Sequence, residues 1–363
     1  TALLTMRSIR DIKVFENIPI LVRSALNVPV ENGRVVNDYR LRRALPTIRF
    51  LAKRGARVVL IGHLGDRGTE TLKPVAEALG VLKSNVSFSD ETVGTRARAA
   101  VRGLAPGNIL VMENLRRNRG EKMNDKTFAK ELAELADIFV QDCFDTCHRP
   151  HASIIGVPEI LPSYVGFLIE EEIQELSRAL SPKHPALAVI GGAKFNTKEG
   201  VLNALLKTYD HVFVGGALAN DFLKAAGREV GKSLVSEVDK ARIKKILMNP
   251  KLVIPEDSVV ADEMIMDHGQ KTIALLSELA EKAKTILWNG PLGKYEDGFT
   301  NATDSFARAV ADSGARSVVG GGDTVAAIEG LSLLPRFSFV STGGGAMLQF
   351  LAKGSIPGID ALG

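Results

Sequence analysis

The sequence predicts an α/β protein of two domains, each built on a parallel sheet that helices cover on both faces. Three observations lead to this prediction. Short β-prone runs alternate with helical patterns along the whole chain, and most of the runs in the second half end at glycines. The chain also has 363 residues, which is too long for one ordinary hydrophobic core.

The composition is that of a soluble globular protein, with 45% hydrophobic and 24% charged residues. No apolar run approaches the roughly 18 residues that span a bilayer, and the opening residues 1–6 are too short for a secretory signal. We therefore expect a cytoplasmic protein, and the two cysteines agree with a reducing compartment. The net charge of +4 suits anionic ligands and is too small to indicate nucleic acid.

The first half contains β-prone runs separated by helical patterns such as 41–53 and 125–136, in which apolar residues recur three and four apart. The runs are 20–22, 57–61, 109–112 and 137–140. Because strands and helices alternate, we expect the strands to be parallel and their carboxyl ends to lie at one edge of the sheet.

Basic side chains follow each of these runs. They are Arg23, His63 with Arg67, Arg116 with Arg117, and His148 with Arg149 and His151. A single surface arginine is usually only solvated or paired with an acid. Cations after four neighbouring strands instead indicate a site for a small, multiply anionic molecule, because the guanidinium fork suits phosphate and carboxylate.

Cys143, Cys147, His148 and His151 form a C-x3-C-H-x2-H pattern that could be read as a zinc site. Structural zinc sites usually bring together two separated pairs of ligands, whereas these four residues lie within nine positions. We favour the alternative, that the cysteines are buried or begin a helix.

An amphipathic helix is expected over 166–181, followed by Pro182 and Pro185, which end it. Its apolar stripe comprises Leu168, Ile169, Ile173, Leu176 and Leu180. We interpret it as the helix between the domains. A second alternating set then begins, with β-prone runs at 186–190, 211–214, 252–254, 285–288, 316–319 and 337–341.

The run that ends at Val319 is followed by Gly320, Gly321 and Gly322 and then by a helical pattern. Glycines let backbone amides approach a ligand closely, and a helix N-terminus attracts anions. Asp323 and Thr324 could cap this helix, or one of them could face a metal. A glycine turn can also be a plain connection. Similar turns at 191–192, 215–216 and 343–345 favour a phosphate-binding edge.

Lys194 and Lys198 are four residues apart at a predicted helix start, and we expect them to share a helix face. Such a pair either holds an anion between the two charges or forms a solvated basic face. The P-loop pattern and the protein-kinase catalytic loop are absent from the sequence, and the first strand turn lacks a dinucleotide fingerprint.

Taken together and in order, these segments resemble the phosphoglycerate kinase family over nearly the whole chain. The matching segments include Asn27-Val-Pro, Glu113-Asn-Leu-Arg, His148-Arg-Pro-His, Gly191-Gly-Ala-Lys, Trp288-Asn-Gly-Pro, Val319-Gly-Gly-Gly-Asp-Thr and Ser341-Thr-Gly-Gly-Gly-Ala. The resemblance implies two Rossmann-like domains: 1–165, completed by about 342–363, and 183–341. They would be joined by a helix at 166–182, with the C-terminal tail returning to the N-terminal domain.

The resemblance also implies the reaction, a reversible phosphoryl transfer between 1,3-bisphosphoglycerate and Mg-ADP in glycolysis, with domain closure in a monomer. The N-terminal domain would bind 3-phosphoglycerate or 1,3-bisphosphoglycerate, and the C-terminal domain would bind ADP or ATP with Mg²⁺. The implied substrate residues are Asn27, Arg40, His63, Arg116 and Arg149. The implied nucleotide residues are Lys198, Glu296, Gly320, Gly321, Gly322, Asp323 (also the magnesium ligand) and Thr324. The implied catalytic residues are Arg40, Lys194, Gly344 and Gly345.

The chain departs from the family pattern around the acid substrate. Ala25 stands where the family usually has an aspartate, and Asp66 stands where it has an arginine. Asp145 and Cys147 stand where glycine and alanine are common. We hypothesise that Arg67 or Arg23 compensates for these changes.

Two functions of different classes follow. The first is an active kinase with a redrawn acid site, and the second is a nucleotide-binding, non-catalytic relative whose substrate site has decayed. The retained lysines, Asp323 and the substrate-facing cations favour the active kinase. A dehydrogenase is disfavoured, because the first strand turn lacks the dinucleotide fingerprint.

Overall fold

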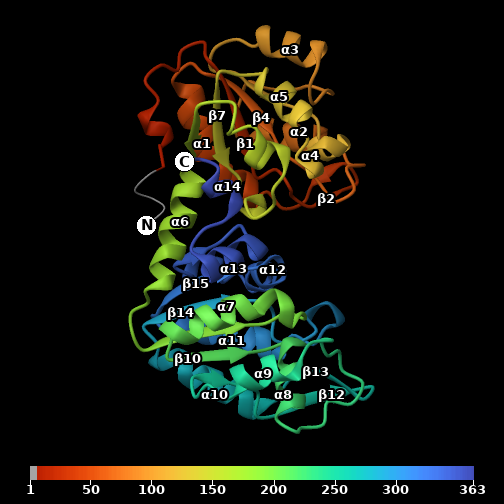
Figure 1. Ribbon diagram of the computed structural model, residues 1–363, viewed down its shortest axis with the longest axis vertical. Coiled ribbons are helices and arrows are strands. Elements are labelled where there is room, and N and C mark those ends of the chain that lie inside the picture. Colours follow the sequence, from red (N-terminus) through yellow and green to blue (C-terminus); the bar gives the residue numbers. More distant parts are fainter. Residues whose placement is uncertain (1–5) are drawn as a thin grey trace. The chain divides into compact units, whose positions relative to one another are not determined.

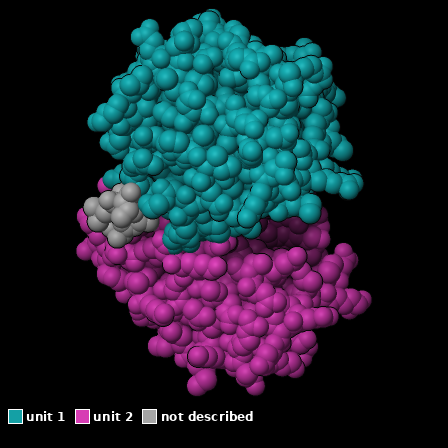
Figure 2. All heavy atoms as spheres, turned by 45° about the horizontal axis from the view of Figure 1, so that its top comes forward, with its two compact units in different colours: residues 1–174, 355–363 teal, residues 175–354 magenta. Residues whose placement is uncertain are grey.

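The computed structural model describes residues 6–363 and divides them into two compact units (Figures 1 and 2). The first unit comprises the described residues up to Gln174 together with Ser355–Gly363, and the second comprises Glu175–Gly354. The sequence-based judgement on a secretory signal concerns residues 1–6, and residues 1–5 lie outside the described part. Within residues 6–363, no helix combines the length and the apolar character that crossing a membrane requires.

The first unit is built on a six-stranded parallel sheet with the strand order β5-β6-β4-β1-β7-β8. The strands are β1 (Pro19–Ser24), β4 (Arg57–Ile61), β5 (Val86–Phe88), β6 (Ile109–Val111), β7 (Ile138–Asp142) and β8 (Ser163–Val165). The four runs expected from the sequence are β1, β4, β6 and β7. The remaining two strands, β5 and β8, were not expected from the sequence; they are three-residue strands at the two edges of the sheet.

Both faces of this sheet are covered, as the sequence predicts. Alternate residues of β1 and β4, such as Ile20 and Val58, belong to one buried apolar cluster with α1 and α2. The residues between them, such as Leu21 and Val59, are equally buried outside that cluster, on the other face. The helices are α1 (Tyr39–Lys53), α2 (Lys73–Leu82), α3 (Thr95–Arg102), α4 (Arg119–Met123), α5 (Lys126–Ala133) and α14 (Pro357–Asp360). A small hairpin pairs β2 (Val30–Glu31) with β3 (Arg34–Val35).

Helix α6 (Phe167–Leu180) confirms the helix expected over 166–181 and runs through the boundary between the two units (Figure 1). Its start is fixed by Asp142 at the end of β7, which accepts a hydrogen bond from the backbone N–H of Leu168 at 3.0 Å. Gly166 is required there, because a Cβ would lie 2.2 Å from an oxygen of this carboxylate. Burial raises the pKa of Asp142 to about 7.

The second unit has its own six-stranded parallel sheet, ordered β11-β10-β9-β14-β15-β16. The strands are β9 (Ala186–Ile190), β10 (His211–Val214), β11 (Leu252–Val253), β14 (Thr285–Asn289), β15 (Arg316–Gly320) and β16 (Phe339–Val340). All six were expected from the sequence, with ends that differ by two residues at most. The helices are α7 (Phe195–Thr208), α8 (Leu218–Ala225), α9 (Lys240–Leu247), α10 (Gln270–Lys282), α11 (Asn301–Asp312), α12 (Gly322–Gly330) and α13 (Gly344–Lys353).

An antiparallel hairpin in the second unit was missed by the sequence analysis. It pairs β12 (Ser258–Ala261) with β13 (Met264–His268) through Asp262 and Glu263, both of which have positive φ. In β12 two valines are adjacent, and in β13 three apolar residues precede Asp267 and His268, so no clean alternation indicates these strands. Ser355–Gly363 belong to the first unit. Residues 342–354, which the resemblance implied would also complete the first domain, belong to the second unit, where α13 packs on α7.

Short helical segments complete the fold. Those of 3-10 type are Ile9–Asp11, Leu115–Arg117, Phe144–Thr146, Tyr295–Asp297 and Leu334–Arg336, and Ala152–Gly156 is a π-helical turn. Two of them, Leu115–Arg117 and Phe144–Thr146, follow β6 and β7 directly and hold residues of the candidate site.

Candidate functional site

The first unit gathers basic side chains at the carboxyl edge of its sheet. His63 follows β4, Arg116 lies in the short helix after β6, and Arg149 follows β7. Arg40 joins them from the first turn of α1. Because β1, β4, β6 and β7 are parallel, their ends meet at one edge, and the sequence pattern of cations after strands becomes one cluster.

A chain of hydrogen bonds links three of the predicted substrate residues. The Nη1 of Arg40 donates to the backbone oxygen of Asn27 at 2.7 Å, and the amide oxygen of Asn27 accepts from the N–H of Gly65 at 3.0 Å. The Nη1 of Arg116 donates to the backbone oxygen of Gly65 at 2.5 Å. The loop after β4 therefore holds Asn27 and Arg116 in fixed positions relative to each other.

His63 is buried and is oriented by Arg23. The Nη2 of Arg23 lies 3.0 Å from the Nδ1 of His63. A guanidinium can only donate, so Nδ1 accepts and the proton of the neutral ring is on Nε2. Burial first, and then the charge of Arg23, lower the pKa of His63 well below its ordinary value. His63 is thus a neutral residue that offers an Nε2–H donor.

Arg149 is exposed, and its positive charge shifts the pKa values of neighbouring basic groups in the cluster. Burial and the nearby Arg149 charge lower the pKa of Arg116, and Arg149 also contributes to the lowered pKa of His63. The structure therefore brings Asn27, Arg40, His63, Arg116 and Arg149 together.

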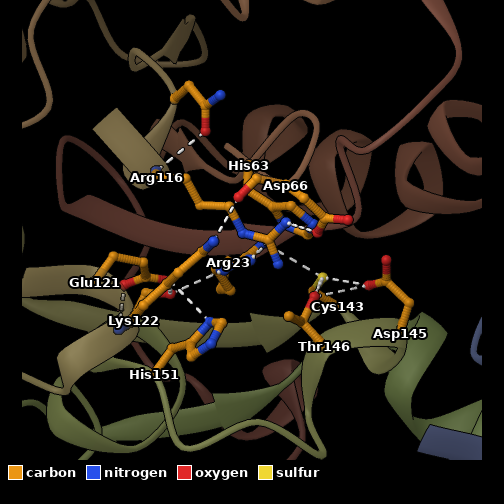
Figure 3. Close-up of polar contacts among 12 residues, drawn as sticks. Arg23, His63, Asp66, Arg116, Glu121, Lys122, Cys143, Asp145, Thr146 and His151 are labelled. Atoms are coloured by element: carbon orange, nitrogen blue, oxygen red, sulfur yellow. Dashed lines mark hydrogen bonds and ion pairs between the residues drawn. The ribbon is translucent and has the colours of Figure 1, made fainter. Parts of the chain in front are cut away.

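Arg23 lies in the middle of a buried network, with Cys143, Asp145 and Thr146 on one side and Glu121 and His151 on the other (Figure 3). Its side chain donates to the Ser153 hydroxyl at 3.0 Å, to the backbone oxygen of Ser24 at 2.8 Å and to the Cys143 sulfur at 3.3 Å. Because Arg23 is fully buried and bonded to these partners, it holds the His63 ring in a fixed orientation. This placement does not favour the hypothesis that Arg23 itself compensates at the substrate; Arg67 is exposed and stays a candidate.

The two cysteines are buried, as we favoured. The Cys143 thiol donates to the Oδ1 of Asp145 at 2.7 Å, and the Cys147 thiol donates to the backbone oxygen of Cys143 at 3.2 Å. Burial raises the pKa of the Cys143 thiol to about 12 and that of Cys147 well above its ordinary value, so both are protonated. Protonated thiols bonded to protein acceptors do not suit zinc, which needs thiolates.

Two residues that depart from the family pattern carry carboxylates to this cluster. The Oδ2 of Asp145 lies 3.5 Å from the Nη1 of Arg40, and the Oδ1 of Asp66 lies 2.8 Å from the Nη1 of Arg116. Ala25, which directly follows β1, is fully buried. Each of two predicted substrate arginines thus has an acidic partner.

The glycine turns of the second unit meet along its sheet edge in the order of the strands. The backbone N–H of Leu218, after β10, donates to the oxygen of Gly192, after β9, at 2.7 Å. A Cβ at Gly191 would lie 2.2 Å from the backbone oxygen of Pro291, in the turn after β14. A Cβ at Gly344 would lie 3.2 Å from the Cα of Gly321, in the turn after β15. The structure confirms one glycine-lined edge.

Helix α12 begins at Gly322, after Gly321 at φ 102°. Thr324 is buried, and its Oγ1 accepts from the backbone N–H of Gly290 at 2.9 Å. No side chain among residues 6–363 caps α12, so the capping role expected for Asp323 or Thr324 is wrong. The first amides of α12 stay open to a ligand, and the Asp323 carboxylate is exposed next to them.

A cavity of about 470 Å³ lies in the second unit beside this edge. Its lining includes Gly192, Gly216, Pro291, Glu296 and Asp323. Its volume is in the range of small-molecule sites. The predicted nucleotide residues Glu296 and Asp323 therefore line one cavity, together with the turns after β9, β10 and β14.

Lys198 lies next to this cavity, because a Cβ added at Gly192 would lie 3.4 Å from its Cε. Burial lowers the pKa of Lys198 to about 8. Lys194 is exposed at the N-cap position of α7, in extended backbone. The expectation that the two lysines share a helix face is therefore wrong, since the helix begins one residue after Lys194. Gly344 and Gly345 form the first turn of α13.

Sequence reasoning missed the far wall of the cavity, which Asn220, Ser233 and residues 264–268 form. The wall depends on tertiary contacts: the N–H of Ile265 donates to the Ser233 hydroxyl at 2.7 Å, and the N–H of Lys232 donates to the oxygen of Glu263 at 2.8 Å. No spacing in the sequence connects these segments. A two-residue Asp-Glu turn between short strands was the one local signal for the hairpin.

Comparisons with known proteins agree with this geometry. The model of the phosphoglycerate kinase family matches residues 9–354. The phosphoglycerate kinase of Pelotomaculum thermopropionicum is 41% identical, with 98% of each chain covered. That of Thermus thermophilus is 42% identical, with 94% of this chain and 96% of the relative covered.

Solved structures agree as well. The phosphoglycerate kinase of Pyrococcus horikoshii matches with a TM-score of 0.88 and 32% identity, and that of Coxiella burnetii with 0.83 and 37%, each covering 98% of both chains. The chain therefore belongs to the phosphoglycerate kinase family, the glycolytic phosphotransferases that act on a carboxyl group.

Proposed function

We propose that this chain transfers a phosphoryl group reversibly between 1,3-bisphosphoglycerate and Mg-ADP, giving 3-phosphoglycerate and Mg-ATP. The observation that carries the proposal is that the two units have different kinds of binding surface. One unit gathers cations that suit a small anionic acid, and the other has a glycine-lined edge beside a cavity of about 470 Å³.

In the first unit, Asn27, Arg40, His63, Arg116 and Arg149 bind the acid. The arginines pair with its phosphate and carboxylate oxygens, and His63 donates from Nε2. The hydrogen bonds from Arg40 to Asn27 and from Arg116 to Gly65 support this role, because they orient the donors before the substrate arrives.

In the second unit, the turn 320–322 and Thr324, at the start of α12, receive the nucleotide phosphates. Lys198 neutralises them, and Glu296 holds the ribose. The exposed Asp323 carboxylate at the start of α12 fits Mg²⁺, which is usually bound by one or two carboxylates together with phosphate oxygens. When bound, Mg²⁺ would neutralise negative charge on the phosphate groups.

The transfer itself needs alignment and charge stabilisation more than covalent help. Arg40 and Lys194 neutralise the migrating phosphoryl group, and the amides of Gly344 and Gly345 at the start of α13 assist. An acyl phosphate is open to attack by water, which favours closing the domains only when both ligands are bound. A monomeric, cytoplasmic enzyme stays the expectation from the sequence.

A coupled assay tests the proposal: 3-phosphoglycerate and Mg-ATP are supplied, and 1,3-bisphosphoglycerate formation is followed through its reduction. We expect turnover, together with micromolar to millimolar binding of Mg-ADP by calorimetry. Nucleotide binding without turnover would favour the alternative, a non-catalytic nucleotide-binding relative. Asp66 and Asp145, which face the substrate arginines, are the observation that keeps this alternative open.

A further inference from the structure

The Asp145 carboxylate has a defined place in the first unit. Its Oδ1 accepts from the Cys143 thiol at 2.7 Å and from the Thr146 hydroxyl at 3.1 Å. Its Oδ2 is directed to the Nη1 of Arg40 at 3.5 Å. One oxygen is therefore anchored by Cys143 and Thr146 in the loop after β7 (Figure 3), and the other faces an arginine of the candidate site.

This carboxylate is ionised although only 10% of its side chain is exposed. Burial alone would raise the pKa of Asp145, but the charge of Arg40, the bond from Cys143 and the charge of Arg23 outweigh burial and lower it to about 2. A buried charge is costly unless it is paired and hydrogen-bonded, so a negative charge at this position must be well compensated.

Arg40 is held from two directions. Its Nη1 donates to the backbone oxygen of Asn27, in the loop after β1, and faces Asp145, in the loop after β7. β1 and β7 are neighbours in the sheet, with Ser24 paired to Asp142. Two acceptors from adjacent strand ends therefore limit the directions in which this long, otherwise mobile side chain can point.

From this geometry we infer that Asp145 is a positioning residue: its carboxylate holds the Arg40 guanidinium in the direction from which it meets the phosphoryl group. The inference rests on the proposed function and deepens it. Asp66 does not act in this way, because its side chain is 86% exposed and nothing comparable to Cys143 and Thr146 anchors it in the described residues. The competing view is that Asp145 only repels an anionic substrate.

The two views predict opposite results for Asp145→Asn, which keeps the shape and removes the charge. If Asp145 positions Arg40, kcat for 3-phosphoglycerate falls tenfold or more, while the KM for 3-phosphoglycerate stays the same or falls. Asp145→Glu keeps the charge and retains more of kcat than Asp145→Asn. Glu134→Gln is the matched control, because Glu134 pairs with Arg98 at 2.8 Å on an exposed surface; its kcat and KM stay at the wild-type values.

A kcat that is unchanged, or a kcat/KM that rises, in Asp145→Asn overturns the inference. Thr146→Val provides a second test if Asp145→Asn does not fold: it removes one donor to the carboxylate, and kcat should fall at least twofold. An unchanged kcat in that variant overturns the inference as well.

A readout without activity separates this inference from the proposed function. Modification of Arg40 by phenylglyoxal, followed by peptide mass mapping, should be at least threefold faster in Asp145→Asn than in the wild type. Equal rates contradict the positioning role. If the wild type does not turn over 3-phosphoglycerate, the proposed function fails, yet the labelling rates still decide whether Asp145 holds Arg40.

Discussion

The hydroxyl oxygen of Thr324 accepts a hydrogen bond from the backbone N–H of Gly290 at 2.9 Å. Thr324 lies in the first turn of α12, and Gly290 lies in the turn after β14. Both residues are buried. This bond therefore connects two neighbouring glycine turns at the edge where we place the nucleotide phosphates.

Thr324→Val should destabilise the protein, because it keeps the shape of the side chain but leaves a buried N–H without its acceptor. We expect a loss of about 1–3 kcal/mol in the free energy of unfolding, measured by urea denaturation. Mg-ADP affinity, measured by calorimetry, should fall as well. Thr324→Ser keeps the oxygen and serves as the control. If the valine variant is as stable as the wild type, the bond does not hold the turns together.

Gly191→Ala and Gly322→Ala should differ in stability although both add one methyl group at the glycine-lined edge. A Cβ at Gly191 would lie 2.2 Å from the backbone oxygen of Pro291, which cannot move without shifting the turn. A Cβ at Gly322 has no such neighbour among the described residues. We expect Gly191→Ala to lose about 1–3 kcal/mol or more by denaturation, and Gly322→Ala to stay near the wild type. Equal stabilities would contradict the close approach of these turns.

Lys198→Met should stabilise the protein without nucleotide. Burial lowers the pKa of Lys198 from its ordinary 10.5 to about 8. Below pH 8 the buried ammonium therefore destabilises the folded state. The cost is on the order of 3 kcal/mol. Between pH 8 and 10.5 the folded state loses the proton first, and the cost disappears. The advantage of the variant should therefore shrink from pH 7 to pH 10 in denaturation experiments.

Lys198→Arg is the companion variant, because arginine stays charged throughout this pH range. Its stability relative to the wild type should fall between pH 8 and 10.5, because the wild type loses its buried charge in this range and the arginine keeps its own. Nucleotide affinity should fall in Lys198→Met. A methionine variant whose stability relative to the wild type is independent of pH would show that Lys198 titrates at its ordinary pKa.

Asp66→Asn should tighten the binding of 3-phosphoglycerate, because it releases the Nη1 of Arg116 from a carboxylate 2.8 Å away. The Asp66 side chain is exposed, so the effect should be modest, about twofold to fivefold in KM at low ionic strength, and should shrink as salt is added. Steady-state kinetics at about 20 mM and about 300 mM salt provide the measurement, because the Debye length is shorter at the higher concentration. A higher KM in Asp66→Asn would mean that the carboxylate aids binding.

Arg67→Ala tests whether this exposed arginine replaces the one that the family carries at position 66. We expect the KM for 3-phosphoglycerate to rise tenfold or more, since a charged hydrogen bond contributes roughly 1.5–3 kcal/mol. The KM of Arg67→Lys should lie between those of the wild type and Arg67→Ala, because lysine keeps the charge and loses the planar fork. An unchanged KM in Arg67→Ala removes Arg67 from the substrate site.

Much of the candidate site could be predicted because its residues follow strands. In a parallel sheet the residues after neighbouring strands meet at one edge, so the runs ending near Arg23, His63, Arg116 and Arg149 were enough to expect a cluster of cations. The glycines after β9, β10, β15 and β16 indicated the second edge by the same rule.

Other features have no local signal. Arg23 is fully buried and bonded to His63, and Asp145 faces Arg40. Both contacts depend on which strands are adjacent in the sheet. The helical register assigned to Lys194 was wrong because the turn after β9 extends one residue further than the spacing indicates. The hairpin 258–268 was not expected because its two strands show no clean alternation of apolar and polar residues.

The sequence alone predicted two α/β domains, a helix between them, edges that carry cations and glycines, and the family, because the alternation of strands and helices and the spacing of apolar residues are local properties of the chain. Only the tertiary structure decided which polar groups pair. Hydrogen bonds such as that from Gly290 to Thr324, and ion pairs such as Arg40 with Asp145, join residues far apart in the chain. Their partners are chosen by burial, which leaves a polar group no water to bond with.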